Sequence, residues 1–283
     1  MALRIYNNIY SLNTQRHLER NNNAVGLSLE RLSSGLRINR AGDDPAGLAI
    51  SEALRADVKS LNQALRNTND GISMINTAEG ALSETSSILS RMRELAIQSS
   101  TGTVGDDERV TIELEFAALL SEIERISAVT EFNGQKLLDG SLASGAAETV
   151  ALHIGFQATT NDKIDLNVAV DLTAVNSTTL GISASTVATA TGAEAAISLI
   201  DTAIETVAVS RGKLGAVQNR LVHTVANLSS SAENLQAAES KIRDADYASE
   251  VAQFTRNQVL VQASTSMLAQ ANLIPQSVLQ LLV

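Results

Sequence analysis

The chain has 283 residues, a formal net charge of −10 and 44% hydrophobic residues, enough for a sizeable core in one or two domains. Cysteine is absent, which excludes disulfides and thiolate metal sites, and no apolar run reaches the roughly eighteen residues that span a membrane. Aromatic residues make up 2% and only two prolines occur, a composition typical of long helices.

The charge is unevenly distributed along the chain. Residues 1–40 hold six arginines against Glu19 and Glu30, a net of +4 that leaves −14 for the remainder. These arginines are spread among apolar positions without an aromatic platform, so we expect no nucleic-acid binding and interpret them as complementary to acidic surfaces of neighbouring copies. The first residues lack a basic segment followed by an apolar run and a cleavage site, so we expect no cleaved signal peptide.

The first expected helix covers residues 3–36. Its apolar residues recur at spacings of 7, 4, 3 and 4, which indicates a coiled-coil stripe, namely Leu18, Val25, Leu29, Leu32 and Leu36. A connector follows over residues 39–46. It ends with Asp44 as N-cap and Pro45 in the first helical position, which predicts the start of a second helix.

The second helix is expected over residues 46–100 and the third from Asp106, where three acidic residues occupy the first turn. Thr68, Glu79 and Ser86 interrupt the apolar stripe of the second helix. A helix this long exceeds a compact globule, so the pattern predicts a bundle of helices packed beside it.

A change of composition separates the third helix from the fourth. Asn133-Gly134 is a strong hairpin-turn signal, and residues 150–156 and 164–170 partly alternate, which predicts a β-hairpin at about 149–171. The fourth helix is expected over 193–240, with Arg211, Gln218 and Glu239 as breaks in its stripe.

The last expected helix runs from about Tyr247 to the C-terminus, with a broad apolar face and a kink or restart at Pro275. Its end is almost entirely apolar, and burying five of the terminal side chains would gain very roughly 7–15 kcal/mol before ordering costs. Inside one chain the two terminal helices have only each other as partners. We therefore expect them to pack against further copies of the chain.

The predicted fold is mainly α: a long antiparallel helical bundle or coiled coil, a small β-hairpin region and a terminal two-helix coiled-coil core domain. The residues expected to form a polymerisation core are Leu18, Val25, Leu29, Leu32, Leu36, Val251, Phe254, Leu260, Met267, Leu268, Ile274, Val278, Leu279, Leu281 and Leu282.

Motifs at both ends of the chain resemble bacterial flagellin. At the N-terminal end these are residues 11–14 (SLNT), 30–39 (ERLSSGLRIN), 41–50 (AGDDPAGLAI) and 69–72 (NDGI). At the C-terminal end they are residues 238–250 (AESKIRDADYASE), 268–272 (LAQAN) and 275–279 (PQSVL). The resemblance covers about residues 1–140 and 175–283, without room for the outer domains of larger flagellins, so the chain is similar to a short, two-domain flagellin.

The resemblance implies an inner core domain of residues 1–45 and 245–283, and a helical rod of residues 46–244 that carries the hairpin. It implies assembly into the helical filament of the bacterial flagellum and secretion by the flagellar export apparatus. It further implies a chaperone on the C-terminal helix before export, and contacts with cap and junction proteins.

The resemblance also implies a surface read by an innate immune receptor of animals. Arg91, Leu95 and Glu115 match the family pattern, whereas Leu119 stands where receptor-binding members often carry Arg. Subunit contact or simple solvation would equally account for Arg91 and Glu115.

No catalytic or cofactor constellation is found in the sequence. His17, His153 and His223 are isolated, and the paired acids at 43–44 and 106–107 stand at helix starts, where capping explains them. We expect no enzyme activity, cofactor or membrane insertion. A hook–filament junction protein, a secreted monomeric binding module or immune ligand, and a cytoplasmic coiled-coil rod are the alternatives to a filament subunit.

Overall fold

The structure is a computed structural model that describes residues 8–146 and 149–280, and for residues 274–280 the backbone only. It divides into two compact units, one of residues Met1–Ala56 and Asn234–Val283, the other of residues Asp57–Glu233. The expected inner core domain, 1–45 with 245–283, falls within the first unit.

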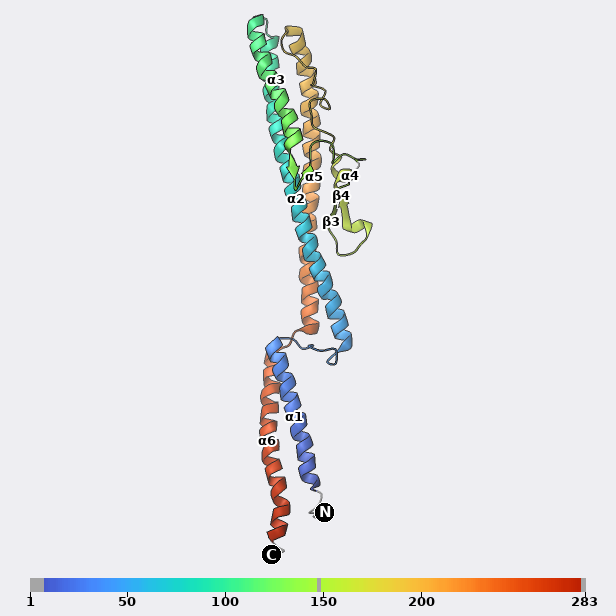
Figure 1. The fold of residues 1–283 in the computed structure, drawn as a ribbon, viewed down its shortest axis with the longest axis vertical. Coiled ribbons are helices and arrows are strands. Elements are labelled where there is room, and N and C mark those ends of the chain that lie inside the picture. The colour runs from blue at the N-terminus through green and yellow to red at the C-terminus, as the bar shows by residue number, and fades with distance from the viewer. Residues whose placement is uncertain (1–7, 147–148, 281–283) are drawn as a thin grey trace. The chain divides into compact units, whose positions relative to one another are not determined.

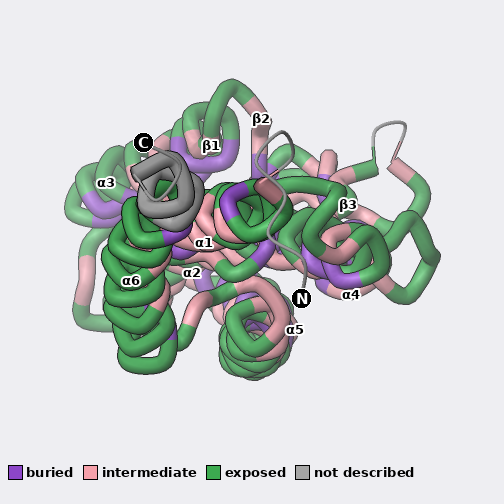
Figure 2. Tube along the Cα trace, turned by 90° about the horizontal axis from the view of Figure 1, so that it is seen from below, coloured by how far each residue is buried: buried purple, intermediate pink, exposed green. Residues whose placement is uncertain are grey.

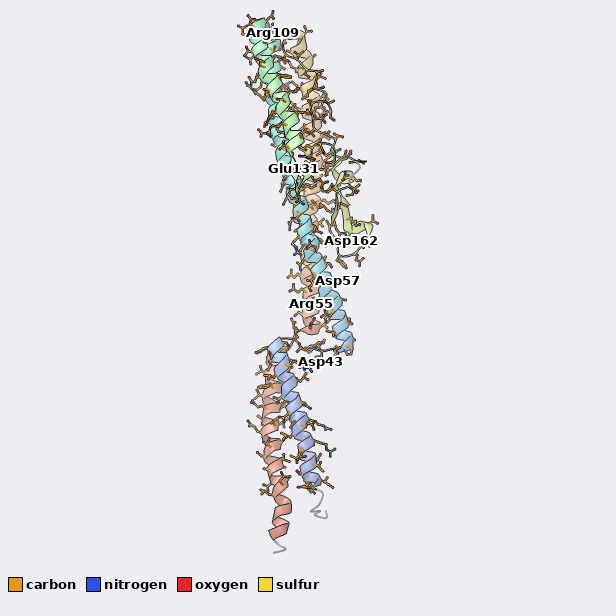
Figure 3. All side chains as sticks on the ribbon, in the orientation of Figure 1. Asp43, Arg55, Asp57, Arg109, Glu131 and Asp162 are labelled. Carbon is orange, nitrogen blue, oxygen red and sulfur yellow. The ribbon has the colours of Figure 1, made fainter. Side chains whose placement is uncertain are left out.

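The second unit contains α3 (Asp106–Val129) and the greater part of α2 (Pro45–Ser100) and α5 (Ala190–Arg243), three long helices that lie side by side in Figure 1. Helix α3 turns back along α2, and Arg109 (labelled in Figure 3) fixes the turn. Its buried guanidinium donates to the carbonyl oxygens of Ser99 at 2.9 Å and Thr101 at 3.2 Å, and to Asp106 at 2.9 Å. The predicted acidic first turn of α3 is confirmed.

The core of this unit forms where the apolar stripes of the three helices meet. Apolar residues that recur every three or four positions predicted such stripes. Its fully buried side chains include Leu82, Leu89, Phe116, Ile123 and Leu214. The mainly helical fold expected from the sequence is confirmed.

Two short antiparallel hairpins follow α3. Strand β1 (Glu131–Phe132) pairs with β2 (Gln135–Lys136). Between them the predicted turn is confirmed, with Asn133 at φ 51° and Gly134 at φ 81°. Both residues need the left-handed region that Asn and Gly tolerate best, which explains the Asn-Gly sequence.

The second hairpin joins β3 (Ala151–His153) to β4 (Lys163–Asp165), with a short 3-10 helix, η1 (Thr160–Asp162), before β4. The hairpin expected at about 149–171 is therefore present, but the strand expected over 164–170 ends at Asp165, and the expectation was wrong for residues 166–170. Residues Leu166–Val170 form helix α4, because Asp165 caps its start by accepting the N–H of Asn167 at 3.0 Å. The buried Asn167 amide donates to the carbonyl oxygen of Ser141 at 2.8 Å.

The chain between α4 and α5 is tied back onto the helices by carboxylates. Glu124 of α3 accepts the N–H and hydroxyl of Ser177 at 3.1 and 2.8 Å. Asp171, at φ 44°, accepts the N–H of Ser144 at 2.9 Å and the ammonium of Lys213 at 3.4 Å. The Ser144 hydrogen bond, followed by the Lys213 contact, lowers the pKa of the Asp171 carboxyl.

In the first unit, α1 (Ile9–Ser34) and α6 (Tyr247–Gln280) run alongside each other. Helix α1 ends at Gly35, in the left-handed conformation at φ 73°. Asp44 accepts the N–H of Gly47 at 2.9 Å, so the predicted cap of α2 is confirmed. Helix α6 does not restart at Pro275, since it continues to Gln280.

Candidate functional site

The α1–α6 pair carries the candidate site, and its contact seam is defined by polar side chains. Asn21 donates to Ser264 at 2.9 Å, Ser11 donates to Asn272 at 2.8 Å, and Asn8 donates to the carbonyl oxygen of Ala271 at 2.8 Å. Nearer the start of α6, Arg31 lies 3.7 Å from Glu250. These four pairs, which we call the polar rungs, give α1 and α6 one alignment.

The buried positions of the seam are small or polar. Among the described side chains of α1 and α6 the buried ones are Ser11, Ser28, Glu250 and Ala271. No large apolar side chain of the two helices is buried within that set. The hydrophobic effect therefore acts on this pair only through partly covered side chains, since it scales with the apolar area removed from water.

The expected polymerisation-core residues lie on this pair and, where their side chains are described, are at most half-covered. Those that are half-buried are Leu18, Val25, Leu32, Leu36, Phe254 and Leu268, and those that are exposed are Leu29, Val251, Leu260 and Met267. Leu281 and Leu282 lie outside the described residues, as do the side chains of Ile274, Val278 and Leu279. Leu36 lies beyond the end of α1, where it forms an antiparallel bridge with Asp244.

Further exposed apolar residues join this set that the sequence analysis did not select: Ile9, Tyr10, Leu12, Leu27, Tyr247, Val259 and Leu273. They fall outside a single 3/4 stripe, which is the reason that a search for one stripe passed over them. In Figure 2 most of α6 is coloured as exposed. Met267, with 63% of its surface exposed, and Val259, with 58%, show how much of this apolar surface lacks a cover.

The two helices differ in charge. Helix α1 carries Arg16, Glu19, Arg20, Glu30 and Arg31, whereas Arg256 is the only charged side chain in residues 251–283. The exposed surface of α6 mixes apolar side chains with uncharged polar ones such as Gln258, Gln262 and Gln270. Soluble monomers rarely expose apolar patches of more than a few hundred Å², and larger ones mark interaction sites.

The structure brings together two of the three residues of the expected receptor surface. Arg91 of α2 forms ion pairs with Glu115 of α3 at 2.9 Å and with Glu94 at 3.0 Å, and both acids are exposed. The hydrogen bond from Arg91 to Glu115 is the main cause that raises the pKa of the arginine. Leu95 is buried in the helical core and offers no surface to a partner, and Leu119 is half-buried.

Neither a metal centre nor a membrane anchor is found in the described part of the chain. Its His, Asp and Glu residues nowhere gather in a group of three that could hold an ion. Across the same residues, no helix contains a stretch that is both long and apolar enough to cross a bilayer.

Comparison with known proteins identifies the family of the chain. The bacterial flagellin N-terminal helical region matches residues 5–143, and the bacterial flagellin C-terminal helical region matches residues 197–282. The flagellin of Halalkalibacterium halodurans is 50% identical over 279 residues, which cover 98% of this chain and 99% of that protein. The chain belongs to the bacterial flagellin family.

Other flagellins are similar over the same extent. The flagellin of Bacillus subtilis is 47% identical over 305 residues, covering 99% of this chain and 100% of its own length. Flagellin FlaB2 of Treponema pallidum is 42% identical over 285 residues, covering 98% of this chain and 99% of its own length. A putative flagellar hook-associated protein from Vibrio parahaemolyticus shares the fold, with a TM-score of 0.58 over 71% of this chain and all of that structure, at 15% identity.

These flagellin relatives establish the chain as a structural subunit of the flagellar filament, an extracellular assembly. The hook-associated structure is related at the level of the fold alone, so it does not favour a junction protein. Flagellins are structural proteins, and self-assembly is the property that the exposed helix pair has to explain.

Proposed function

We propose that the α1–α6 pair is the part of the subunit that packs between copies and forms the tubular core of the filament. The observation that carries this proposal is the mismatch between the two sides of the pair. The side chains that its own seam buries fully are polar or small, while large apolar side chains such as Leu29, Val259 and Met267 face solvent. Copies of the chain that cover these side chains gain the free energy of burying apolar surface, which the isolated pair does not gain.

Within that core we propose that α6 lies inward of α1. The exterior of α6 is nearly free of charge, and enclosing an unpaired charge costs several kcal/mol, whereas Ala and Val are enclosed without such a cost and Ser and Gln need only a hydrogen-bond partner. Arg16 and Arg20 of α1 then face neighbouring copies, whose residues 41–283 carry a complementary net charge of −14.

The same exposed surface requires a cover before assembly, because a free apolar helix promotes aggregation. We propose that an export chaperone binds α6 and that the flagellar export apparatus secretes the chain, after which cap and junction proteins contact the assembling subunits. The Arg91–Glu115 pair is the proposed contact for an animal innate immune receptor, with Leu95 supporting it from the core rather than touching the receptor.

A seeded-elongation experiment tests the core proposal. Purified chain is added to short filament seeds and followed by electron microscopy, in parallel with a chain that lacks residues 279–283. We expect the intact chain to elongate the seeds and the shortened chain to stay a soluble, largely helical rod by circular dichroism. Normal filaments from the shortened chain would show that the terminal helix is dispensable, contrary to the proposal.

A further inference from the structure

The two terminal helices are connected at their inner ends by a small hydrogen-bonded element, which we call the joint: residues 35–38 and 242–245. Leu36 and Asp244 form an antiparallel bridge. The N–H of Ala245 donates to the carbonyl oxygen of Gly35 at 2.9 Å, and the N–H of Arg37 donates to that of Arg243 at 2.6 Å. Two backbone segments that lie more than two hundred residues apart in the sequence are therefore hydrogen-bonded directly to each other.

The Arg37 side chain closes the joint a second time. Its Nε and Nη2 atoms donate to the carbonyl oxygen of Ile242 at 3.2 and 2.6 Å. This oxygen lies in the last turn of α5, where carbonyl groups lack helical partners and a cation is favoured by the helix dipole. One residue thus binds the end of α5 through both its backbone and its side chain.

The joint is also anchored to the start of α2. Ile38 is buried, and Gly47 packs so close to it that a Cβ at that position would collide with the Ile38 side chain. Arg243 donates to Glu52 of α2 at 2.6 Å. The joint therefore has the buried apolar anchor that the α1–α6 seam lacks.

The joint and the α1–α6 pair therefore differ in how much apolar side chain they bury. Beyond the joint, α1 and α6 meet at the polar rungs, with no large apolar side chain buried among their described residues. Segments more than two hundred positions apart in sequence pair slowly unless something first closes the loop between them. Once the joint has formed, each further rung closes only a short loop.

From these observations we propose that the joint is the nucleus from which α1 and α6 pair, and that the two helices zip outward from it. The inference deepens the proposed role of the pair in the filament core, because it says how the core helices of one subunit find their alignment. Arg37 acts as a positioning residue. It holds the end of α1 close to the start of α6 and, among the described residues, it does not contact the N-terminal end of α1 or the C-terminal end of α6.

Disulfide trapping in the free chain tests this, since the chain has no cysteine of its own. One variant carries Asn21→Cys with Ser264→Cys, at a rung roughly 21 Å from Gly35 along α1. A second carries Ser11→Cys with Asn272→Cys, roughly 36 Å away. Rates of disulfide closure are normalised to those of the same variants in denaturant.

We expect the nearer pair to close at least about threefold faster than the outer pair. Arg37→Gln should slow closure of both pairs roughly three- to tenfold, because it removes the paired donors to Ile242. The matched control is Arg40→Gln, in which the exposed Arg40 loses only its ion pair with Glu30 and both rates should stay within about twofold.

Two results would overturn the proposal: equal closure rates for the two pairs in the otherwise unchanged chain, or an Arg37→Gln effect no larger than that of Arg40→Gln. The comparison of the two pairs does not depend on any Arg37 variant and decides the matter if that variant misfolds. Because closure is measured on the free chain, failure here is distinguishable from failure of seeded elongation, which would contradict the core proposal instead.

Discussion

Replacing one exposed apolar side chain of α6 by a charged one tests whether that surface is covered in the filament. Val259→Glu places a carboxylate where 58% of the valine surface is exposed in the single chain. The matched control is Val168→Glu, which changes the same residue type at a position 69% exposed on α4 of the other unit. Since both valines are largely exposed, neither substitution should disturb the fold of the free subunit.

The expected effect follows from the burial that assembly would add. Covering the remaining exposed part of a valine contributes about 1 kcal/mol. An unpaired carboxylate enclosed in the same contact costs a further 2 kcal/mol or so. A total of about 3 kcal/mol raises the critical concentration for elongation roughly a hundredfold.

The assay measures the concentration of subunit left in the supernatant after seeded elongation and sedimentation. Circular dichroism of both free variants checks that their helical content is unchanged. We expect Val259→Glu to remain in the supernatant and Val168→Glu to sediment close to the unmodified chain. If the two variants reach the same critical concentration, α6 is not enclosed at residue 259 and the assignment of the filament core fails.

Three further predictions concern the single subunit. Gly71→Ala should lower the free energy of unfolding by about 1–3 kcal/mol in denaturant titrations, since its Cβ would collide with Leu152, whereas Gly80→Ala in the same helix meets no atom within 4 Å and should stabilise by about 0.5–1 kcal/mol. Asp171→Asn should be less stable than the parent above pH 3.8, because the lowered pKa means that the ionised carboxylate stabilises the fold there through the Ser144 hydrogen bond and the Lys213 contact. This stabilisation is lost as the pH falls through the folded-state pKa, so the difference should shrink below pH 3.8, and an unchanged difference at low pH would contradict the role of the ionised carboxylate. Amide hydrogen exchange in the free chain should be fast in α1 and α6 and slow in the cores of α2 and α5, and strong protection of residues 1–40 would contradict the weak seam.

The rod could be predicted well from the sequence, including positions that looked like faults. Glu79 and Arg211 each interrupt an apolar stripe, and in the structure they form an ion pair at 2.7 Å. Gln218, another interruption, donates to Asn76 at 2.9 Å. Periodicity identifies each break but does not reveal which breaks face each other, because that depends on the register between two helices far apart in sequence.

The region after the first hairpin was less predictable. Partial alternation over residues 164–170 suggested a strand, yet Asp165 starts a helix of five residues there. A single turn of helix is too short to establish its own period, and the buried Asn167 is held by hydrogen bonds to segments that no local pattern identifies.

The two terminal helices predicted from the sequence are present as α1 and α6, but the contacts that their residues make could not be predicted. The stripe that includes Leu18, Val25 and Leu32 predicted a buried seam, and in the single chain these residues are only half covered. A heptad stripe indicates that a helix needs a partner; it does not say whether that partner belongs to the same chain. The polar rungs were missed because Asn and Ser at isolated positions look like ordinary surface residues.

The polar rungs separate two tasks that most helix pairs combine. In an ordinary coiled coil the same leucines both select the partner helix and provide the binding free energy. Pairing in a wrong register can therefore be as stable as pairing in the right one. In the α1–α6 pair the hydrogen bonds of the polar rungs set the alignment of the two helices but contribute little binding free energy. In the proposed filament core, the exposed apolar surface provides the binding free energy but does little to set the alignment. Terminal helices that pair out of register are therefore held weakly and can separate and pair again. In the proposed filament core, the pairing is fixed only when neighbouring subunits pack around it.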